Sequence, residues 1–197
     1  MFVKKTEKTK GVLEVVCGSM FSGKTEELIR RLKRAEIAKL NVLAFKHSLD
    51  RVRAIEYVMS HSGSKIQAFE VGDPKIILDL VHDKTDIIGI DEVQFFSNDI
   101  VEVIFKLVDS GKRVIAAGLD LDFRGSPFGC MPALLAFADN VTKLKAVCVE
   151  CGNDAQFTQR IVNNMPAKYN DPLIMIGAQE CYQARCRNCY IIDKSVN

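Results

Sequence analysis

A glycine-rich segment, GSMFSGKT, constrains the fold of this chain more than any other feature of its sequence. It occupies residues 18–25 and matches the pattern G-x-x-x-x-G-K-[ST] at every fixed position. A run of β-branched residues precedes it at 12–17, and a stretch with helical periodicity follows at 26–40. Because this order of strand, loop and helix argues against a chance match, the segment predicts a phosphate-binding loop within an α/β fold.

The residue types in this loop suit a nucleoside triphosphate such as ATP. Glycines let backbone N–H groups turn toward phosphate oxygens, and the helix that follows adds the positive end of its dipole. We expect Lys24 to neutralise the β and γ phosphates and Thr25 to offer its hydroxyl to Mg²⁺. The predicted nucleotide-binding residues of the loop are Gly18, Ser19, Met20, Phe21, Ser22, Gly23, Lys24 and Thr25.

Three more apolar runs, at 41–45, 86–90 and 113–118, predict strands that are covered on both faces. Helical patterns at 74–81 and 100–108 lie between them and are long enough to make crossover connections. These features predict an α/β fold with a parallel sheet.

The helix predicted at 26–40 has an apolar face and a basic face. The apolar positions that recur at helical spacing are Leu28, Ile29, Leu32, Ala35 and Leu40. Basic residues occupy the other side, namely Arg30, Arg31, Lys33 and Arg34. We expect this basic cluster to be mostly a solvated face.

The composition changes along the chain and predicts two folded regions. Residues 1–10 are polar and rich in lysine, so we expect a mobile lead-in. Residues 11–143 hold the loop and the predicted sheet, whereas residues 144–197 are predicted to form a smaller lobe.

No apolar run approaches the roughly 18 residues of a membrane span, and there is no export signal. We therefore expect a cytoplasmic protein without a membrane partner.

Two adjacent carboxylates, Asp91 and Glu92, end the apolar run at 86–90. They are expected at the carboxyl edge of a buried strand, where open α/β sheets bind their ligands. Because successive strand residues point to opposite faces, Asp91 can serve Mg²⁺ while Glu92 acts as a general base toward an acceptor. A solvated acidic turn is the alternative, and the phosphate loop upstream favours the catalytic interpretation.

Four of the seven cysteines form two C-x-x-C pairs, Cys148 with Cys151 and Cys186 with Cys189. Without an export signal this spacing favours a structural Zn²⁺ site over disulfides or redox chemistry. Thirty-four residues separate the pairs, so the metal would close a long loop. Cys130 and Cys181 are expected to be buried or inert. His47, His61 and His82 are expected to have surface or packing roles.

Two longer motifs lie between the loop and the cysteine pairs in the sequence: DEVQFF at 91–96 and GLDLDFRGSPFG at 118–129. Together these features resemble the type II, cytosolic-type thymidine kinases, from Gly11 to Tyr190. The resemblance implies a recombinase-ATPase-like core and a zinc lobe with a lasso-like loop that closes over thymidine. It also implies transfer of the γ-phosphoryl group of ATP to the 5′-hydroxyl of thymidine.

The resemblance also implies roles for single residues. Glu92 matches the general base, and Asp91, Gln94 and Asp50 are expected at the nucleotide and its Mg²⁺, with Gln94 also near the nucleoside. Residues expected around thymidine are Met20, Phe95, Leu119, Phe123, Thr158, Leu173, Ile174, Met175, Ile176, Gly177 and Tyr182. Arg160 matches an arginine of the lasso segment.

One departure from the family pattern concerns the residues before Ser60. The family usually has D-x-R there, whereas this chain has Asp50-Arg51-Val52-Arg53, so either Arg51 or Arg53 can reach the phosphates. Position 93 is Val where Gly is common. By the same resemblance we expect a homotetramer that is inhibited by dTTP.

Two other functions compete with this interpretation. The first is an ATP-dependent module that grips single-stranded nucleic acid, which would show basic stripes with stacking aromatic residues. The chain has no Trp, four Tyr and a net charge of +2, so we expect no nucleic-acid partner. The second is a kinase for another small acceptor, such as deoxyuridine or a nucleoside monophosphate.

Overall fold

The centre of the molecule is a seven-stranded sheet. The computed structural model describes residues 10–48, 54–59, 63–173 and 180–193. The strand order is β3-β4-β2-β5-β6-β1-β7, with β3 antiparallel to β4 and the other neighbours parallel. The strands are β1 (Val12–Cys17), β2 (Val42–His47), β3 (Ala54–Met59), β4 (Lys65–Val71), β5 (Ile87–Asp91), β6 (Arg113–Gly118) and β7 (Asn140–Lys143). The predicted α/β fold with a mainly parallel sheet is confirmed.

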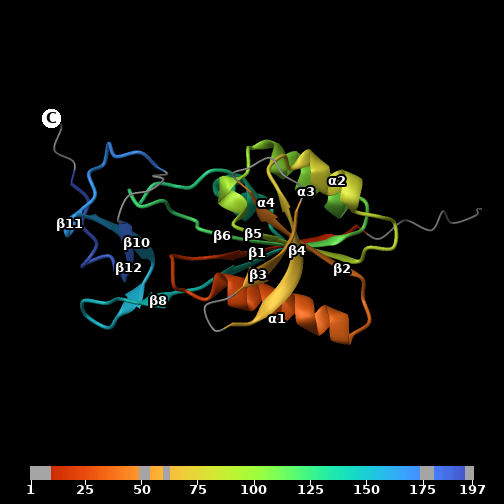
Figure 1. The fold of residues 1–197 in the computed structure, drawn as a ribbon, viewed down its shortest axis with the longest axis horizontal. Helices are drawn as coiled ribbons and strands as arrows, with labels where there is room; N and C mark the ends of the chain where they lie inside the picture. The colour runs from red at the N-terminus through yellow and green to blue at the C-terminus, as the bar shows by residue number, and fades with distance from the viewer. Residues whose placement is uncertain (1–9, 49–53, 60–62, 174–179, 194–197) are drawn as a thin grey trace, which may run out of the picture.

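Helices cover both faces of this sheet (Figure 1). Helix α1 (Lys24–Ile37) lies on one face, and α2 (Lys75–Leu80), α3 (Asp99–Asp109) and α4 (Met131–Phe137) lie on the other. Each face has its own cluster of buried aliphatic side chains. Because both faces are covered, the inner strands are almost continuously apolar.

Helix α1 begins two residues before its predicted start and ends at Ile37. Four of its predicted apolar residues are buried, namely Leu28, Ile29, Leu32 and Ala35. The N–H of Ala38 donates to the carbonyl of Arg34, and Lys39 has a φ of 63°, which turns the chain out of the helix. Leu40 therefore lies beyond the helix and is partly exposed.

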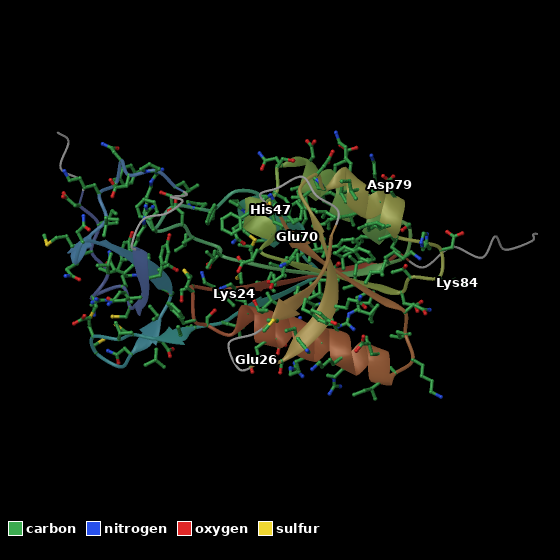
Figure 2. The ribbon with its side chains drawn as sticks, in the orientation of Figure 1. Lys24, Glu26, His47, Glu70, Asp79 and Lys84 are labelled. Atoms are coloured by element: carbon green, nitrogen blue, oxygen red, sulfur yellow. The ribbon has the colours of Figure 1, made fainter. Side chains whose placement is uncertain are left out.

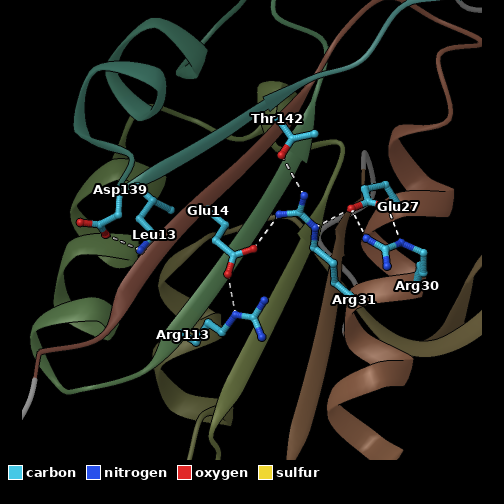
Figure 3. Close-up of polar contacts among 8 residues, drawn as sticks. All are labelled: Leu13, Glu14, Glu27, Arg30, Arg31, Arg113, Asp139 and Thr142. Carbon is cyan, nitrogen blue, oxygen red and sulfur yellow. Dashed lines mark hydrogen bonds and ion pairs between the residues drawn. The ribbon is translucent and has the colours of Figure 1, made fainter.

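Arg31 is the exception to the predicted solvated face of α1 (Figure 3). Its side chain is 14% exposed and lies 2.6 Å from the Glu14 carboxylate of β1. It also donates to Glu27 at 2.7 Å and to the Thr142 hydroxyl at 2.8 Å. Burial raises the pKa of Glu14, but hydrogen bonds from Arg113 and Arg31 outweigh burial and leave that pKa lowered. Arg31 thus ties α1 to the strands β1 and β7.

The chain after β7 forms two small antiparallel sheets, and we call residues 144–193 the cysteine-rich lobe. Strand β8 (Ala146–Val147) pairs with β9 (Asp154–Ala155), and β10 (Phe157–Val162) pairs with β11 (Met165–Pro166) and β12 (Glu180–Arg185). Figure 1 shows the lobe at the end of the sheet where the loop between β1 and α1 lies. Within the described residues, the helices are too short or too polar to cross a membrane.

Candidate active site

The phosphate loop connects β1 to α1 at the end of the sheet that faces the cysteine-rich lobe. Gly18 has a φ of 145°, and a Cβ there would lie 2.3 Å from the Leu144 carbonyl oxygen, so a larger residue does not fit. Lys24 Nζ donates to the Ser19 carbonyl at 2.8 Å, which folds the side chain back over the loop. Figure 2 shows Lys24 and His47 toward this end of the molecule. Burial lowers the pKa of Lys24, and the carboxylates of Glu92 and Asp91 oppose that shift.

Asp91, the last residue of β5, lies against the start of α1. The Thr25 hydroxyl donates to Asp91 Oδ2 at 3.0 Å. Burial and the negative charge of Glu92 raise the pKa of Asp91 to about 6. A hydroxyl oxygen and a carboxylate oxygen are the hard ligands that Mg²⁺ prefers, and a cation there would relieve the cost of the buried charge. The two side chains therefore fit the predicted magnesium position.

Glu92 has an unusual backbone conformation, with a φ of 50°, and caps a short 3-10 helix, η1 (Val93–Phe95). Its carboxylate accepts a hydrogen bond of 2.5 Å from Gln94 Nε2. Gln94 Oε1 in turn accepts from the Leu119 N–H at 3.1 Å. A Cβ at Gly118 would lie 2.5 Å from Gln94 Oε1, so the glycine makes room for this side chain. The Glu92 carboxylate is thus held in place by the buried side chain of Gln94.

Two cavities adjoin at Met20 and Glu92, which line both of them. The phosphate-loop cavity has a volume of about 510 Å³, and the apolar cavity has a volume of about 220 Å³. The other residues that line the phosphate-loop cavity are Phe21, Gly23, Lys24, Thr25, Glu26, Lys46, His47, Tyr57, Val58, Met59 and Asp91. Those of the apolar cavity are Phe95, Leu119, Leu121, Asp122, Phe123, Phe128, Thr158, Leu173 and Tyr182. A ligand in one cavity would therefore meet a ligand in the other beside the Glu92 carboxylate.

The structure gathers most of the predicted site residues around these cavities, although Gly18, Ser19, Ser22 and Gln94 line neither of them. Every predicted thymidine-site residue within the described residues lines the apolar cavity. Several predicted positions lie outside the described residues: Asp50, Arg51, Arg53, His61, Ile174, Met175, Ile176 and Gly177. The side chain of Cys181 also lies outside them.

Sequence reasoning missed several lining residues. Lys46 and His47 end β2, whose pairing with β5 places Lys46 opposite Asp91. Their position at the carboxyl end of a parallel strand, where such sheets bind ligands, could have identified them as site residues. Leu121, Asp122 and Phe128 lie within the GLDLDFRGSPFG motif, but only Leu119 and Phe123 were predicted from it. His47 packs edge-on against Phe96, with ring centroids 4.9 Å apart, which agrees with a packing role.

Cys130 lies apart from the cavities and is buried, as predicted. Its thiol donates to the Val93 carbonyl at 3.2 Å. Burial raises the pKa of Cys130 to about 11, so its thiol stays protonated near neutral pH.

The four paired cysteines lie together in the cysteine-rich lobe. Their Sγ atoms are all within 4.8 Å of one another. The sulfurs of Cys151 and Cys186 are 3.5 Å apart, far longer than the roughly 2.05 Å of a disulfide. Four thiolates at this spacing match a tetrahedral zinc site with no open position. The cluster can therefore hold a zinc ion, as the sequence predicted.

Hydrogen bonds connect the lobe to residues that line the cavities. The Met20 N–H of the phosphate loop donates to the Thr158 hydroxyl of β10 at 3.0 Å. Tyr190, which directly follows Cys189, donates from its hydroxyl to the Phe123 carbonyl at 2.6 Å. The Tyr190 ring also stacks on Phe157, with centroids 4.6 Å apart. The cysteine cluster is thus attached to a wall of the apolar cavity.

A comparison with protein-family models agrees with this geometry. The model of the thymidine kinase family matches residues 11–190. The match covers the phosphate loop, both cavities and all four clustered cysteines. The chain therefore belongs to the thymidine kinase family and is a phosphotransferase that acts on thymidine.

Proposed function

We propose that this protein transfers the γ-phosphoryl group of Mg-ATP to the 5′-hydroxyl of thymidine, and of deoxyuridine. The products would be the nucleoside monophosphate, dTMP from thymidine, and ADP, in nucleotide salvage for DNA synthesis. The observation that carries this proposal is the junction of the two cavities at Met20 and Glu92. ATP would occupy the phosphate-loop cavity and the nucleoside the apolar cavity, so that the 5′-hydroxyl meets the γ-phosphate at the junction.

In this mechanism Glu92 accepts the proton of the 5′-hydroxyl as its oxygen attacks phosphorus. The hydrogen bond from Gln94 keeps the Glu92 carboxylate in one orientation. Lys24 and the backbone N–H groups of residues 18–25 neutralise charge on the transferred group. Because phosphoryl transfer needs mainly positioning and charge neutralisation, these groups can supply most of what the reaction requires.

Thr25 and Asp91 would hold the Mg²⁺ that accompanies ATP. When bound, Mg²⁺ neutralises the charge on the phosphate oxygens during transfer. The hydrogen bond between Thr25 and Asp91 supports this pairing because it brings both oxygens to one place.

The zinc ion of this proposal is structural. Its ligands would be Cys148, Cys151, Cys186 and Cys189, which leave no coordination position for substrate. The metal would support the strands β10 and β12, which contribute Thr158 and Tyr182 to the apolar cavity.

The apolar cavity suits a nucleoside base. Its walls include the rings of Phe95 and Phe123 and the side chain of Leu119. A slot for one methyl group contributes only about 1–3 kcal/mol of discrimination, so preference for thymidine over deoxyuridine should be modest.

Further properties of the proposal rest on membership of the family alone. They are a homotetrameric state, inhibition by dTTP and a cytoplasmic location. The division into a phosphate-loop domain at 11–143 and a zinc lobe at 144–197 is supported by the end of the large sheet at Lys143.

The test of this function is ADP release from Mg-ATP with each natural deoxynucleoside and, separately, with single-stranded DNA. We expect release with thymidine and deoxyuridine, and none above background with DNA. Release that depends on DNA would favour the nucleic-acid module, and release with deoxyuridine but not with thymidine would favour a kinase for another acceptor.

A further inference from the structure

The ring of Phe123, which lines the apolar cavity and is buried, lies against two arginine side chains. The Arg160 guanidinium carbon is 4.7 Å from the ring centroid, and that of Arg124 is 5.2 Å from it. Arg160 comes from strand β10 of the cysteine-rich lobe, whereas Arg124 is the neighbour of Phe123 in the chain. At these distances the positive charges are attracted to the electron-rich faces of the ring.

The same two guanidinium groups bind consecutive backbone carbonyls. Arg124 Nη2 donates to the Asp171 carbonyl at 2.7 Å, and Arg160 Nη1 donates to the Pro172 carbonyl at 2.6 Å. These carbonyls directly precede Leu173, which lines the same cavity as Phe123. The two arginines therefore connect two walls of the apolar cavity that are fifty positions apart in the sequence.

The turn that receives these bonds is also tied locally. The Lys168 N–H donates to Asp171 Oδ2 at 2.9 Å, and the Asp171 N–H donates to the Lys168 carbonyl at 3.0 Å. The Arg124 guanidinium lies 5.6 Å from the centroid of the Tyr169 ring in this turn. Because the turn is closed on itself, an arginine that holds its carbonyls also sets where Leu173 lies.

The burial of Arg160 distinguishes this arrangement from a pair of charges on the protein surface. Arg160 is 0% exposed, and a buried cation is costly unless its charge is met by acceptors or aromatic faces. A planar guanidinium can bind a carbonyl along its edge and contact a ring with its face at the same time, which the ammonium of lysine cannot.

We propose that Arg124 and Arg160 are positioning residues for thymidine, which fix Phe123 and Leu173 as walls of the nucleoside site. This inference rests on the proposed function, because it takes the apolar cavity as the nucleoside site. Neither arginine lines that cavity or the phosphate-loop cavity. Their loss should therefore weaken thymidine binding and leave the ATP site unchanged.

The test is the kinetics of the variant Arg124→Ala in the full-length protein. We expect the KM for thymidine to rise roughly 10-fold, as for loss of a hydrogen bond to a charged group, with kcat and the KM for ATP within about twofold. Arg124→Lys keeps a cation and should give an intermediate KM. Arg113→Ala is the matched control, because it removes a half-exposed arginine that pairs with Glu14, away from both cavities.

Arg160→Lys tests the second arginine without leaving a large void. If the two arginines act together, its effect on the thymidine KM should be smaller in the Arg124→Ala background than in the wild type. An unchanged thymidine KM in folded Arg124→Ala would overturn the inference. So would an equal rise for ATP, or the same rise in Arg113→Ala, because the effect would then be general loss of stability.

Thymidine binding measured by calorimetry separates this inference from the proposed function. A wild type that binds thymidine but does not phosphorylate it would contradict the proposed function alone. Weaker binding by Arg124→Ala than by Arg113→Ala would still support the positioning role, and equal binding would contradict it.

Discussion

The sheet region and the cysteine-rich lobe are stabilised in different ways. The sheet is enclosed by two large clusters of aliphatic side chains, one on each face. The hydrophobic cluster of the lobe contains only small buried residues: Ala146, Cys148, Ala155, Ala184 and Cys186. Two of these are members of the proposed zinc site. Because this cluster buries little apolar surface, the lobe needs another source of stability, and a metal held by the four cysteines would supply it.

The two regions also contribute different groups to the site. Lys24, Asp91 and Glu92 come from the sheet region and would carry the charges of the proposed reaction. Thr158 and Tyr182 come from the lobe and form walls of the apolar cavity. Changes at these three charged residues should therefore alter turnover, whereas changes in the lobe should alter thymidine affinity.

The largest effect should come from Glu92→Gln, which tests the contribution of the sheet region. Removal of a general base should lower kcat by about 10²–10⁴-fold, because nothing then accepts the hydroxyl proton. Binding of ATP and thymidine, measured by calorimetry, should stay within about threefold of wild type. Near-normal turnover in this variant would exclude Glu92 as the base.

Cys148→Ser tests the contribution of the lobe. We expect zinc affinity to fall by about 100-fold or more, since even changes outside the ligand set cost 10–100-fold. The thymidine KM should rise while ATP still binds, because the sheet keeps its own core. Metal analysis and hydrogen exchange, compared between residues 146–190 and 12–118, would measure this.

Cys130→Ser is the matched control for that variant. Cys130 is buried in the sheet region and does not belong to the cluster. It should keep zinc and normal exchange in the lobe. A Cys148→Ser protein with the zinc content and activity of the wild type would contradict a structural metal at the four clustered cysteines.

The elements best predicted from the sequence are those whose residues follow one another in the chain and form a recognisable pattern. The strands at 12–17 and 113–118 match β1 and β6, and the phosphate loop follows directly from its motif. Strands β3, β4 and β7 were missed. Strand β7 has four mostly exposed residues at the sheet edge, so it has no buried apolar pattern to detect.

The relation between the two regions could not be predicted from spacing. The hydrogen bond between Tyr190 and Phe123 joins residues 67 positions apart, and only the folded chain brings them together. The resemblance places Gln94 near the nucleotide and the nucleoside, and the structure adds that its side chain binds Glu92 and the Leu119 N–H. Motifs indicate residue types near a ligand, but they do not reveal which of them hold other residues in place.

A smaller effect is expected for Tyr190→Phe, which cuts the hydrogen bond between the lobe and the cavity wall. A neutral hydrogen bond contributes about 0.5–1.5 kcal/mol, so the thymidine KM should rise by roughly 2–10-fold. The ring keeps its stacking on Phe157, and zinc content should not change. A fall in kcat with an unchanged KM would show that the lobe acts on the chemical step instead.

The smallest effect should follow Glu27→Gln on helix α1, outside the cysteine-rich lobe. Hydrogen bonds from Arg30 and Arg31 lower the pKa of Glu27 to about 2, although burial opposes them. The carboxylate therefore stabilises the fold above about pH 4.5, and this contribution is lost as the pH falls toward 2. Urea unfolding should show a loss below about 1 kcal/mol at pH 7. The same loss at pH 3 would contradict the assigned pKa.

The most direct test of the account compares thymidine with 5′-deoxythymidine in one assay of ADP release from Mg-ATP. Both nucleosides should bind the apolar cavity, but only thymidine carries the hydroxyl that Glu92 would deprotonate. We predict one ADP and one dTMP per turnover with thymidine, and no release above background with 5′-deoxythymidine. Equal ADP release with both nucleosides would contradict transfer across the junction of the two cavities.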